Sequence, residues 1–269
     1  MIRDPYKTVR FAVIIPTYNR AGILEQAVRS VMRQTFTDWE LCVVDDASTD
    51  DTVEHMRAYC YDERIHLVRL EQNCGESFAR NVGIDETQSE LVAFLDSDCL
   101  WYPTYLEKVN AAFLSQAAPD VVSTFIEAIK WDPAADRTED DWAPWINLPF
   151  RLHHMTKRSI WLGPSQVALK RDLLQRVGYY DNYIDEAEDA ELWGRLYMKG
   201  ARWCFINEVL FTSRRHMQSQ TTERQTMTPE QKLARWEQRK AAIAIGGPRT
   251  LRFAEIGCRK DDPFVVHSV

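Results

Sequence analysis

The chain has 269 residues, of which 45% are hydrophobic and 27% are charged. This is an ordinary globular composition, so disordered and collagen-like classes are excluded. The formal net charge is −7. Proteins that bind nucleic acid through their whole surface usually carry the opposite sign, and we predict no nucleic-acid partner.

The charge is unevenly distributed along the chain. Residues 214–260 hold eleven Lys or Arg and four Asp or Glu, a surplus of seven positive charges, so the remaining residues carry fourteen negative charges in excess. An acidic body with a basic tail is therefore the first feature that a functional interpretation has to explain.

The rest of the composition favours a cytoplasmic protein with reduced thiols. No stretch approaches the roughly 20 apolar residues that span a bilayer, and residues 1–10 lack the apolar core of a signal peptide. The six cysteines show no CxxC pair and no zinc-like spacing; they are Cys42, Cys60, Cys74, Cys99, Cys204 and Cys258.

Strand and helix patterns alternate over the first ninety residues. Short apolar runs predict buried strands, and apolar residues at helical spacing predict the helices between them. The predicted strands are residues 11–15, 41–44, 65–70 and 91–95, and the predicted helices begin near residues 21, 48 and 75, the second reaching about residue 61 and the third residue 88. This alternation predicts an α/β fold with a mostly parallel sheet flanked by helices.

Each of three polar clusters directly follows a predicted strand. They are residues 17–20, 45–46 and 96–98. Ligands of open α/β sheets bind beyond the carboxyl ends of the strands, so we expect the functional site at this edge.

The second half of the chain is less regular. We predict a helix over residues 104–117, a strand over 121–126, a helix over 188–199 closed by Gly200, two short strands over 203–206 and 209–211, and a polar helix over 229–244.

Asp96, Ser97 and Asp98 form a DxD sequence immediately after an apolar strand. Two carboxylates at this spacing suit Mg²⁺ or Mn²⁺, which bind one or two carboxylates together with the phosphate oxygens of a substrate. A solvated turn that caps a helix is the alternative interpretation. The pair Asp45-Asp46 raises the same question, because capping of the next helix by Ser48 would leave both aspartates unexplained.

Five segments in this order resemble family 2 glycosyltransferases, which have the GT-A fold. They are VIIPTYNR (13–20), SVMRQTFTDWELCVVDDASTDDT (30–52), NCGESFARNVGI (73–84), LVAFLDSD (91–98) and the region from GPSQVALK to LWGRL (163–196). The resemblance covers about residues 10–216. It implies a single Rossmann-like sheet in a GT-A domain over residues 1–217, with a nucleotide-sugar-binding half (10–100) and an acceptor-binding half (101–217), followed by a helical, basic extension (218–269).

The resemblance also implies a donor site. Its segment Pro16, Thr17, Tyr18, Asn19 and Arg20 would line the nucleotide pocket, with Tyr18 stacked on uracil and Asp46 hydrogen-bonded to the base. Arg80 and Asn81 would lie near the nucleotide and its diphosphate. Asp96 and Ser97 would contact the ribose or sugar side, and Asp98, with Asp96, would hold the metal bridging the diphosphate.

The same resemblance places the catalytic pair at Glu188-Asp189. Inverting transfer needs a base that takes the proton of the acceptor hydroxyl; we predict Asp189 as this base and Glu188 as a residue that positions the acceptor. Acidic residues also favour helix N-termini for electrostatic reasons, which is the alternative for this pair.

Several further residues have two interpretations. His216 follows a strand-like run and is either an additional metal ligand, as in related enzymes, or an ordinary surface residue. Trp142, Trp145 and Trp161 either stack on a sugar or pack in the core, and His153-His154 is interpreted as acceptor-region surface.

Four other classes compete with a glycosyltransferase. A signalling receiver domain also ends strands with aspartates, but the downstream lysine signature is absent. A dehydrogenase is disfavoured because no GxGxxG follows a strand. A GT-A-like protein that binds a sugar nucleotide without transfer, and a sugar-phosphate nucleotidyltransferase, remain alternatives.

We therefore predict an inverting, metal-dependent glycosyltransferase of cell-surface polysaccharide or glycoconjugate synthesis. Its donor would be a nucleotide sugar, most simply a UDP-sugar, its acceptor a saccharide or lipid-linked hydroxyl, and its cofactor Mn²⁺ or Mg²⁺. The basic tail would bring the protein into peripheral contact with anionic lipid at the inner face of the membrane.

Overall fold

The computed structural model describes residues 10–130, 162–184, 186–215, 226–244 and 250–252. Its strands are β1 (Phe11–Thr17), β2 (Trp39–Asp45), β3 (Ile65–Leu70), β4 (Leu91–Phe94), β5 (Cys99–Trp101), β6 (Val121–Lys130), β7 (Val167–Lys170), β8 (Trp203–Arg215) and β9 (Thr250–Arg252). Its helices are α1 (Ala21–Met32), α2 (Thr52–Arg57), α3 (Glu76–Asp85), α4 (Tyr105–Phe113), α5 (Arg171–Val177), α6 (Glu188–Met198) and α8 (Pro229–Ala244), with a 3-10 turn, η2, over Pro164–Gln166.

In the described part of the chain, the strands form one sheet in the order β5-β8-β6-β7-β4-β1-β2-β3-β9. The pairs that β1 makes with β2 and β4, and the pair of β2 with β3, are parallel. Antiparallel pairs join β4 to β7 and β7 to β6, so the sheet is mixed beyond its N-terminal half. The predicted α/β fold is confirmed.

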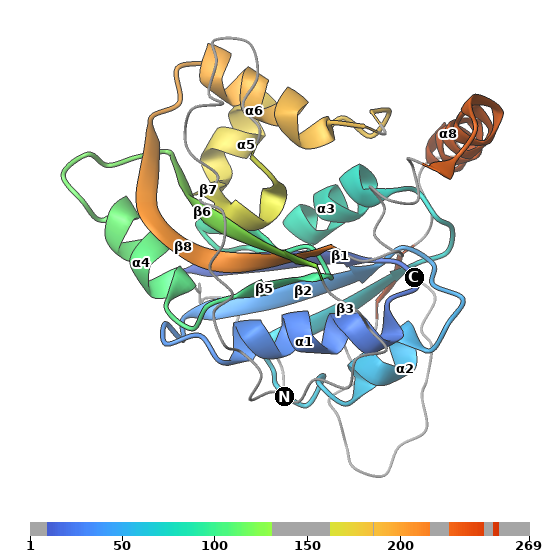
Figure 1. Cartoon of the computed structure of the whole chain (residues 1–269), viewed down its shortest axis with the longest axis horizontal. Helices are drawn as coiled ribbons and strands as arrows, with labels where there is room; N and C mark the ends of the chain where they lie inside the picture. Colours follow the sequence, from blue (N-terminus) through green and yellow to red (C-terminus); the bar gives the residue numbers. More distant parts are fainter. Residues whose placement is uncertain (1–9, 131–161, 185, 216–225, 245–249, 253–269) are drawn as a thin grey trace.

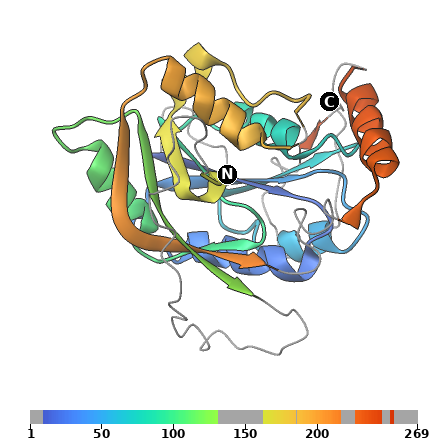
Figure 2. The same cartoon turned by 45° about the horizontal axis from the view of Figure 1, so that its top comes forward.

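Helices cover both faces of the sheet (Figure 1, and from a second angle Figure 2). α1, α2 and α4 pack on one face, where Val28 and Leu106 join the buried cluster that includes Val13 of β1. α5 and α6 pack on the other face around Ile14 and Trp193. Because successive side chains of a strand point to opposite faces, β1 is buried along its whole length.

α3 packs unusually close to the centre of the sheet. A Cβ atom at Gly83 would lie 2.4 Å from the Cγ2 atom of Ile14 on β1, so the approach requires a glycine. This helix starts at Glu76, directly after the carboxyl end of β3, and its position fixes the side chains of its first turns at the edge of the sheet.

The structure corrects several predicted boundaries. α2 ends at Arg57 rather than near residue 61, and α4 ends at Phe113. The two short strands predicted over residues 203–211 are one strand, β8, whose register against β6 shifts around Phe125. The short elements β5, β7, α5 and β9 were not predicted, whereas Gly200 has the positive φ of 77° expected after α6.

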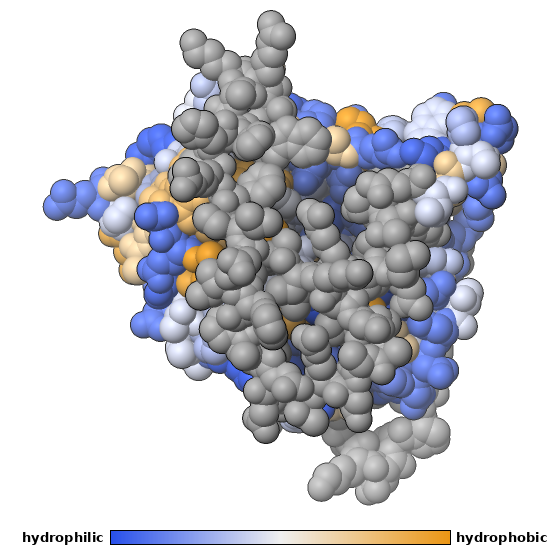
Figure 3. Space-filling view, in the orientation of Figure 1, coloured by the Kyte–Doolittle hydropathy of each residue, from blue (hydrophilic) through white to orange (hydrophobic). Residues whose placement is uncertain are grey.

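The visible described surface is mainly hydrophilic, with small hydrophobic patches (Figure 3). Met198 and Leu114 are among the large hydrophobic side chains that remain exposed. Within the described residues, no helix combines the length and the apolar character that crossing a bilayer requires.

Candidate active site

The carboxylate of Asp46 organises the loop that connects β3 to α3. Its two oxygens accept hydrogen bonds from the backbone N–H groups of Cys74 (2.7 Å) and Gly75 (2.8 Å). Gly75 has a φ of 92°, which favours glycine and turns its N–H toward the carboxylate. Burial raises the pKa of Asp46 to about 7, against the lowering effect of the two hydrogen bonds. Asp46 is therefore a buried acceptor at the strand edge.

The loop after β1 is fixed by side chains of the loop after β2. Ser48 accepts a hydrogen bond from the backbone N–H of Asn19 (2.8 Å), and Thr52 accepts one from that of Arg20 (2.9 Å). The alternative in which Ser48 caps α2 is not what the structure has: α2 begins at Thr52 after Asp51, and the Thr52 N–H donates to the carboxylate of Asp50. Tyr18, which is half-buried, lies in the same loop, directly before Asn19 and Arg20.

Two polar atoms at the same edge are buried without a hydrogen-bond partner among the described residues. They are the hydroxyl oxygen of Thr17 and the Oδ1 atom of Asp45. Buried polar atoms of native proteins are normally paired, because an unpaired one costs about 1–3 kcal/mol. The edge between β1 and β2 therefore holds two buried polar atoms whose hydrogen-bonding capacity the described residues leave unused.

Arg80 of α3 joins the Asp96 carboxylate of the DxD turn to that of Glu188 at the start of α6. Its guanidinium is 2% exposed and contacts Asp96 at 2.9 Å, Glu188 at 3.0 Å and Glu76 at 3.2 Å. These carboxylates raise its pKa, although burial acts in the opposite direction. Arg80 thus lies within a carboxylate network, next to the region expected for the diphosphate.

Asp96 is fixed from two sides. One oxygen accepts from Arg80, and the other accepts from the hydroxyl of Ser165 at 2.8 Å. The Ser165 hydroxyl also accepts a hydrogen bond from the backbone N–H of Asp96 at 2.9 Å. Ser97 beside it is buried at 8% exposure. Both Asp96 oxygens are therefore engaged in holding this turn.

Asp98 is partly exposed at the end of the same turn. Its backbone carbonyl accepts a hydrogen bond from the buried guanidinium of Arg214 at 2.7 Å, which fixes the turn to β8. Among the described residues, no group of three or more His, Cys, Asp or Glu side chains is arranged to hold a metal ion. One or two carboxylates suffice for Mg²⁺ or Mn²⁺ when phosphate oxygens complete the coordination. The oxygen chemistry of Asp98 fits such a cation.

Glu188 and Asp189 begin α6 on the opposite side of the site. The preceding residue, Ala187, has a φ of 60°, an uncommon value for a non-glycine residue and one that often marks functional sites. Burial raises the pKa of Glu188 to about 7, and burial also raises the pKa of Asp189. One Asp189 oxygen accepts the Ala190 N–H at 2.7 Å. Burial thus raises the pKa of both carboxyls, that of Glu188 to about 7.

Asn81 has a different environment from that of its neighbour Arg80. Its amide donates to the Tyr180 carbonyl and to Asn182, both at 2.8 Å, and its oxygen accepts the Tyr180 N–H at 3.0 Å. It therefore holds the segment that leads into α6. His216, Trp142, Trp145, Trp161 and His153-His154 lie outside the described residues.

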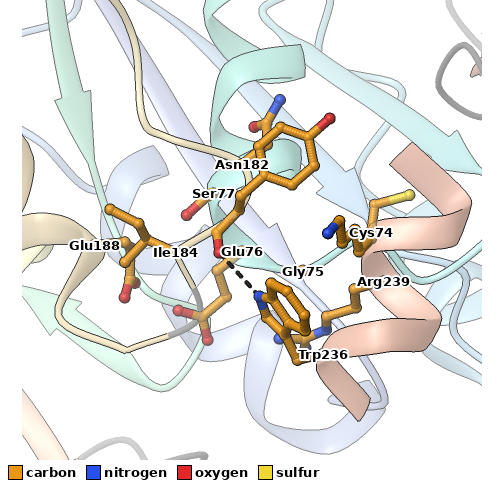
Figure 4. Close-up of a pocket in the computed structure, with 11 residues that line it drawn as sticks. Cys74, Gly75, Glu76, Ser77, Asn182, Ile184, Glu188, Trp236 and Arg239 are labelled. Carbon is orange, nitrogen blue, oxygen red and sulfur yellow. Dashed lines mark hydrogen bonds between the residues drawn. The ribbon is translucent and has the colours of Figure 1, made fainter. Parts of the chain in front are cut away.

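A pocket opens between α3, α6 and α8, with about 350 Å³ of empty volume that is partly continuous with solvent. Glu76 and Glu188 line one side, and Trp236, Arg239 and Lys240 of α8 line the other (Figure 4). The contribution of α8 was not predicted, because its polar helical pattern alone does not indicate which surface it covers.

Sequence reasoning also missed Glu76, Ser165 and Arg214. Glu76 and Arg80 are four residues apart on one helix, a spacing that pairs opposite charges and was a usable signal. Ser165 and Arg214 reach the DxD turn from 69 and 116 residues away, and no local pattern indicates such contacts.

Comparison with known proteins agrees with this architecture. The family model described as glycosyl transferase family 2 matches residues 12–178. Validoxylamine A glucosyltransferase of Streptomyces hygroscopicus is 32% identical over 220 residues, which cover 70% of this chain and 51% of that protein. Staphylococcus aureus TarS, named as a poly(ribitol-phosphate) beta-N-acetylglucosaminyltransferase, is 26% identical over 76% of this chain and 35% of its own length.

Two solved structures share the fold. TarS residues 1–349 in complex with UDP-GlcNAc match with a TM-score of 0.64 and 22% identity, over 88% of this chain and 66% of that chain. The mannosyltransferase PcManGT of Pyrobaculum calidifontis, in complex with GDP-Man and Mn²⁺, matches with a TM-score of 0.58 and 21% identity, over 91% of this chain and 66% of that chain.

The fold is thus that of the GT-A class of glycosyltransferases. The chain belongs to glycosyl transferase family 2. It spans about half the length, or less, of the two curated relatives described above.

Proposed function

We propose that this chain carries out inverting, metal-dependent transfer of a sugar from a nucleotide sugar, a UDP-sugar in the simplest case, to a hydroxyl of a saccharide or lipid-linked acceptor. The observation that carries the proposal is the contact of Arg80 with both Asp96 and Glu188. Through these contacts the buried Arg80 guanidinium holds a carboxylate of the donor side close to a carboxylate of the acceptor side. A reaction between two substrates requires that these two sides lie close together.

On the donor side, the residues after β1 and β2 bind the nucleoside. Tyr18 offers an aromatic face to the base, and Asp46 and the unpaired Thr17 hydroxyl offer hydrogen-bonding groups. Asp98, with Asp96 beside it, would hold the divalent cation, as would His216 if it reaches the site. When bound, the cation neutralises charge on the departing nucleoside diphosphate.

On the acceptor side, Asp189 takes the proton of the acceptor hydroxyl while the hydroxyl oxygen attacks the anomeric carbon of the donor sugar. Attack from the face opposite the leaving group inverts the configuration at that carbon. Glu188, held at 3.0 Å by Arg80, orients the acceptor. A base is most effective when its pKa lies near the working pH, and the raised pKa of Asp189 is in that direction.

The proposed biological setting is the synthesis of a cell-surface polysaccharide or another glycoconjugate. The name of TarS refers to poly(ribitol-phosphate), and the solved TarS complex contains UDP-GlcNAc. PcManGT was solved with GDP-Man and Mn²⁺. These relatives support a nucleotide-sugar donor, a divalent cation and a polymeric acceptor for this chain.

Two substitutions separate the assigned roles. We expect Asp98→Ala and Asp189→Ala each to abolish sugar transfer, because one removes the cation ligand and the other the base. Titration calorimetry with UDP and Mn²⁺ should detect weakened binding for Asp98→Ala alone. Full activity of Asp189→Ala would overturn the base assignment. Wild-type protein that neither binds nor hydrolyses UDP- or GDP-sugars with Mn²⁺ would overturn the proposed function.

A further inference from the structure

α8 lies beyond residues 12–178, the part of the chain that matches the family model, yet it contacts loops on both sides of the site. Arg239 donates to the side chain of Asn73 at 3.2 Å, in the loop that holds Asp46. Trp236 donates from its indole N–H to the carbonyl of Tyr183 at 3.0 Å, in the segment leading to Glu188. The helix therefore joins the donor-side loop to the acceptor-side loop.

These contacts position one face of α8 at the pocket. Arg239 is 6% exposed and packs against Gly75, whose added Cβ would lie 3.3 Å from the guanidinium. Figure 4 shows Trp236 and Arg239 on α8, with Ile184 and Glu188 across the pocket. The buried Arg239 thus holds α8 in a position in which Trp236 lines the pocket.

Lys240 places its ammonium over one face of the Trp236 ring, which leaves the other face for a sugar. Its ammonium lies 4.8 Å from the ring centroid, and it makes no ion pair with a described residue. Across the pocket, Glu76 and Glu188 both contact the guanidinium of Arg80, which compensates part of their negative charge. The α8 side of the pocket therefore combines an aromatic ring with a cation that is available to a ligand.

We propose that Trp236 and Lys240 form an acceptor subsite for a saccharide that carries a negative charge, either a carboxylate or a phosphate ester. The apolar face of a pyranose packs on an aromatic ring, and a lysine ammonium is a suitable point charge for an anion. This inference rests on the proposed function, because it takes the Glu188 side of the site as the acceptor side.

The test measures binding of small saccharides to the full chain in the presence of saturating UDP and Mn²⁺. The probes are methyl β-D-glucuronide for a carboxylate, glucose 6-phosphate for a phosphate ester, and methyl β-D-glucoside and glucose as their neutral counterparts. Ligand-observed NMR titration gives the dissociation constants. We expect at least one anionic probe to bind about ten-fold more tightly than its neutral counterpart, and the tighter of the two identifies the anionic group.

Lys240→Gln should reduce this preference to less than about three-fold, and Trp236→Ala should weaken both members of a probe pair. Lys232→Gln is the matched control, since it removes one positive charge from the same helix but breaks an exposed ion pair with Glu186 outside the pocket. It should keep the preference. The thermal unfolding midpoint and UDP affinity of each variant verify that the fold and the donor site are intact.

Equal binding of anionic and neutral probes, or a preference that survives Lys240→Gln, would overturn the subsite. Probes that bind only when UDP and Mn²⁺ are left out would also overturn it, because the pocket would then belong to the donor. In each of these cases UDP still binds. Failure of the proposed function is different, since the wild type would then not bind UDP at all.

Discussion

Arg80 is the residue on which the largest number of site carboxylates depends. It contacts Glu76, Asp96 and Glu188 while being 2% exposed. A buried cation of this kind adds little net stability compared with an apolar cluster, but removal of one partner leaves the others uncompensated. Its main contribution is therefore to hold the DxD turn and the start of α6 in one geometry.

Arg80→Ala is expected to lower the free energy of unfolding by about 3–5 kcal/mol, because three carboxylates lose their shared cation. Urea denaturation measures the change. The control is Arg176→Ala, which breaks an i,i+4 pair with Asp172 in which both side chains are 65% exposed. Exposed pairs contribute about 0–1 kcal/mol, so equal losses in the two variants would contradict the assigned role of Arg80.

The pKa of Glu188 predicts how stability changes with pH. Its pKa rises from 4.5 to about 7 on folding, so the folded protein holds this proton more tightly than the unfolded chain. The resulting stabilisation is complete below pH 4.5 and is lost as the pH rises toward 7. The contribution amounts to roughly 1–3 kcal/mol of the free energy of unfolding that is lost between pH 5 and pH 8. Glu188→Gln should remove it.

Urea unfolding of the wild type and of Glu188→Gln at pH 5 and pH 8 tests this sign. Glu191→Gln is the control, because Glu191 lies in the same helical turn and pairs with Arg195 at 2.6 Å. If the free energy of unfolding changed between pH 5 and pH 8 by the same amount in the wild type and in Glu188→Gln, the Glu188 proton would not be held more tightly in the folded protein.

At the residue scale, the sequence predicts which carboxylates lie at the site better than it predicts their contacts. Asp46 and Asp96 were expected there because each follows a predicted strand, and Glu188 because the family resemblance places it there. The hydroxyl of Ser165, which holds Asp96, comes from a turn 69 residues away, and such long-range contacts arise from tertiary packing. The roles of the predicted residues in catalysis stay predictions.

At the scale of elements, the contact between α3 and β1 determines where the site's first helical turns lie. The distance of 2.4 Å between a Cβ at Gly83 and Ile14 leaves no space for a methyl group unless the helix moves. Since Glu76 and Arg80 are on this helix, a shift of α3 also shifts the carboxylate network.

Gly83→Ala should therefore destabilise the protein by about 1–3 kcal/mol, the usual cost of overpacking, and should lower sugar transfer. Gly194→Ala is the matched control, because a Cβ at this position of α6 meets nothing within 4 Å. Helix propensity predicts a gain of about 0.5–1 kcal/mol there. Thermal denaturation measures both, and a stabilising Gly83→Ala would contradict the close packing of α3.

Two of the predicted elements have the same bounds as elements of the structure. Residues 65–70 were predicted to form a strand and coincide with β3, and the predicted helix over residues 229–244 coincides with α8. β5 has three residues and β7 has four, too few for a periodicity to appear. β8 looked like two strands because its register shift interrupts the pattern.

At the scale of the whole molecule, fewer basic residues of the tail are available to a docking surface than its charge count indicates. Arg214 is 2% exposed and Arg239 is 6% exposed, and both hold parts of the site. Lys232 pairs with Glu186. Membrane contact through the tail stays a prediction, and its charge would have to come from the remaining basic residues.

Cosedimentation with vesicles tests this contact. Each basic residue near an anionic surface adds about 1 kcal/mol, so Arg259→Gln with Lys260→Gln should reduce binding to phosphatidylserine vesicles about ten-fold or more at low salt. Arg176→Gln with Lys199→Gln, on the exposed surface of α5 and α6, is the control and should change it less. Equal binding to neutral and anionic vesicles would contradict the prediction.

The hydrogen bond between Arg80 and Glu188 also limits which regions of related chains can be recombined. The two residues are 108 positions apart, one in the region expected to bind the donor and one in the region expected to bind the acceptor. A recombinant that joins the first region of this chain to the second region of a relative must inherit a carboxylate at the position of Glu188, or it buries an arginine with one partner fewer. The two regions are thus not structurally independent, because one guanidinium depends on carboxylates from both.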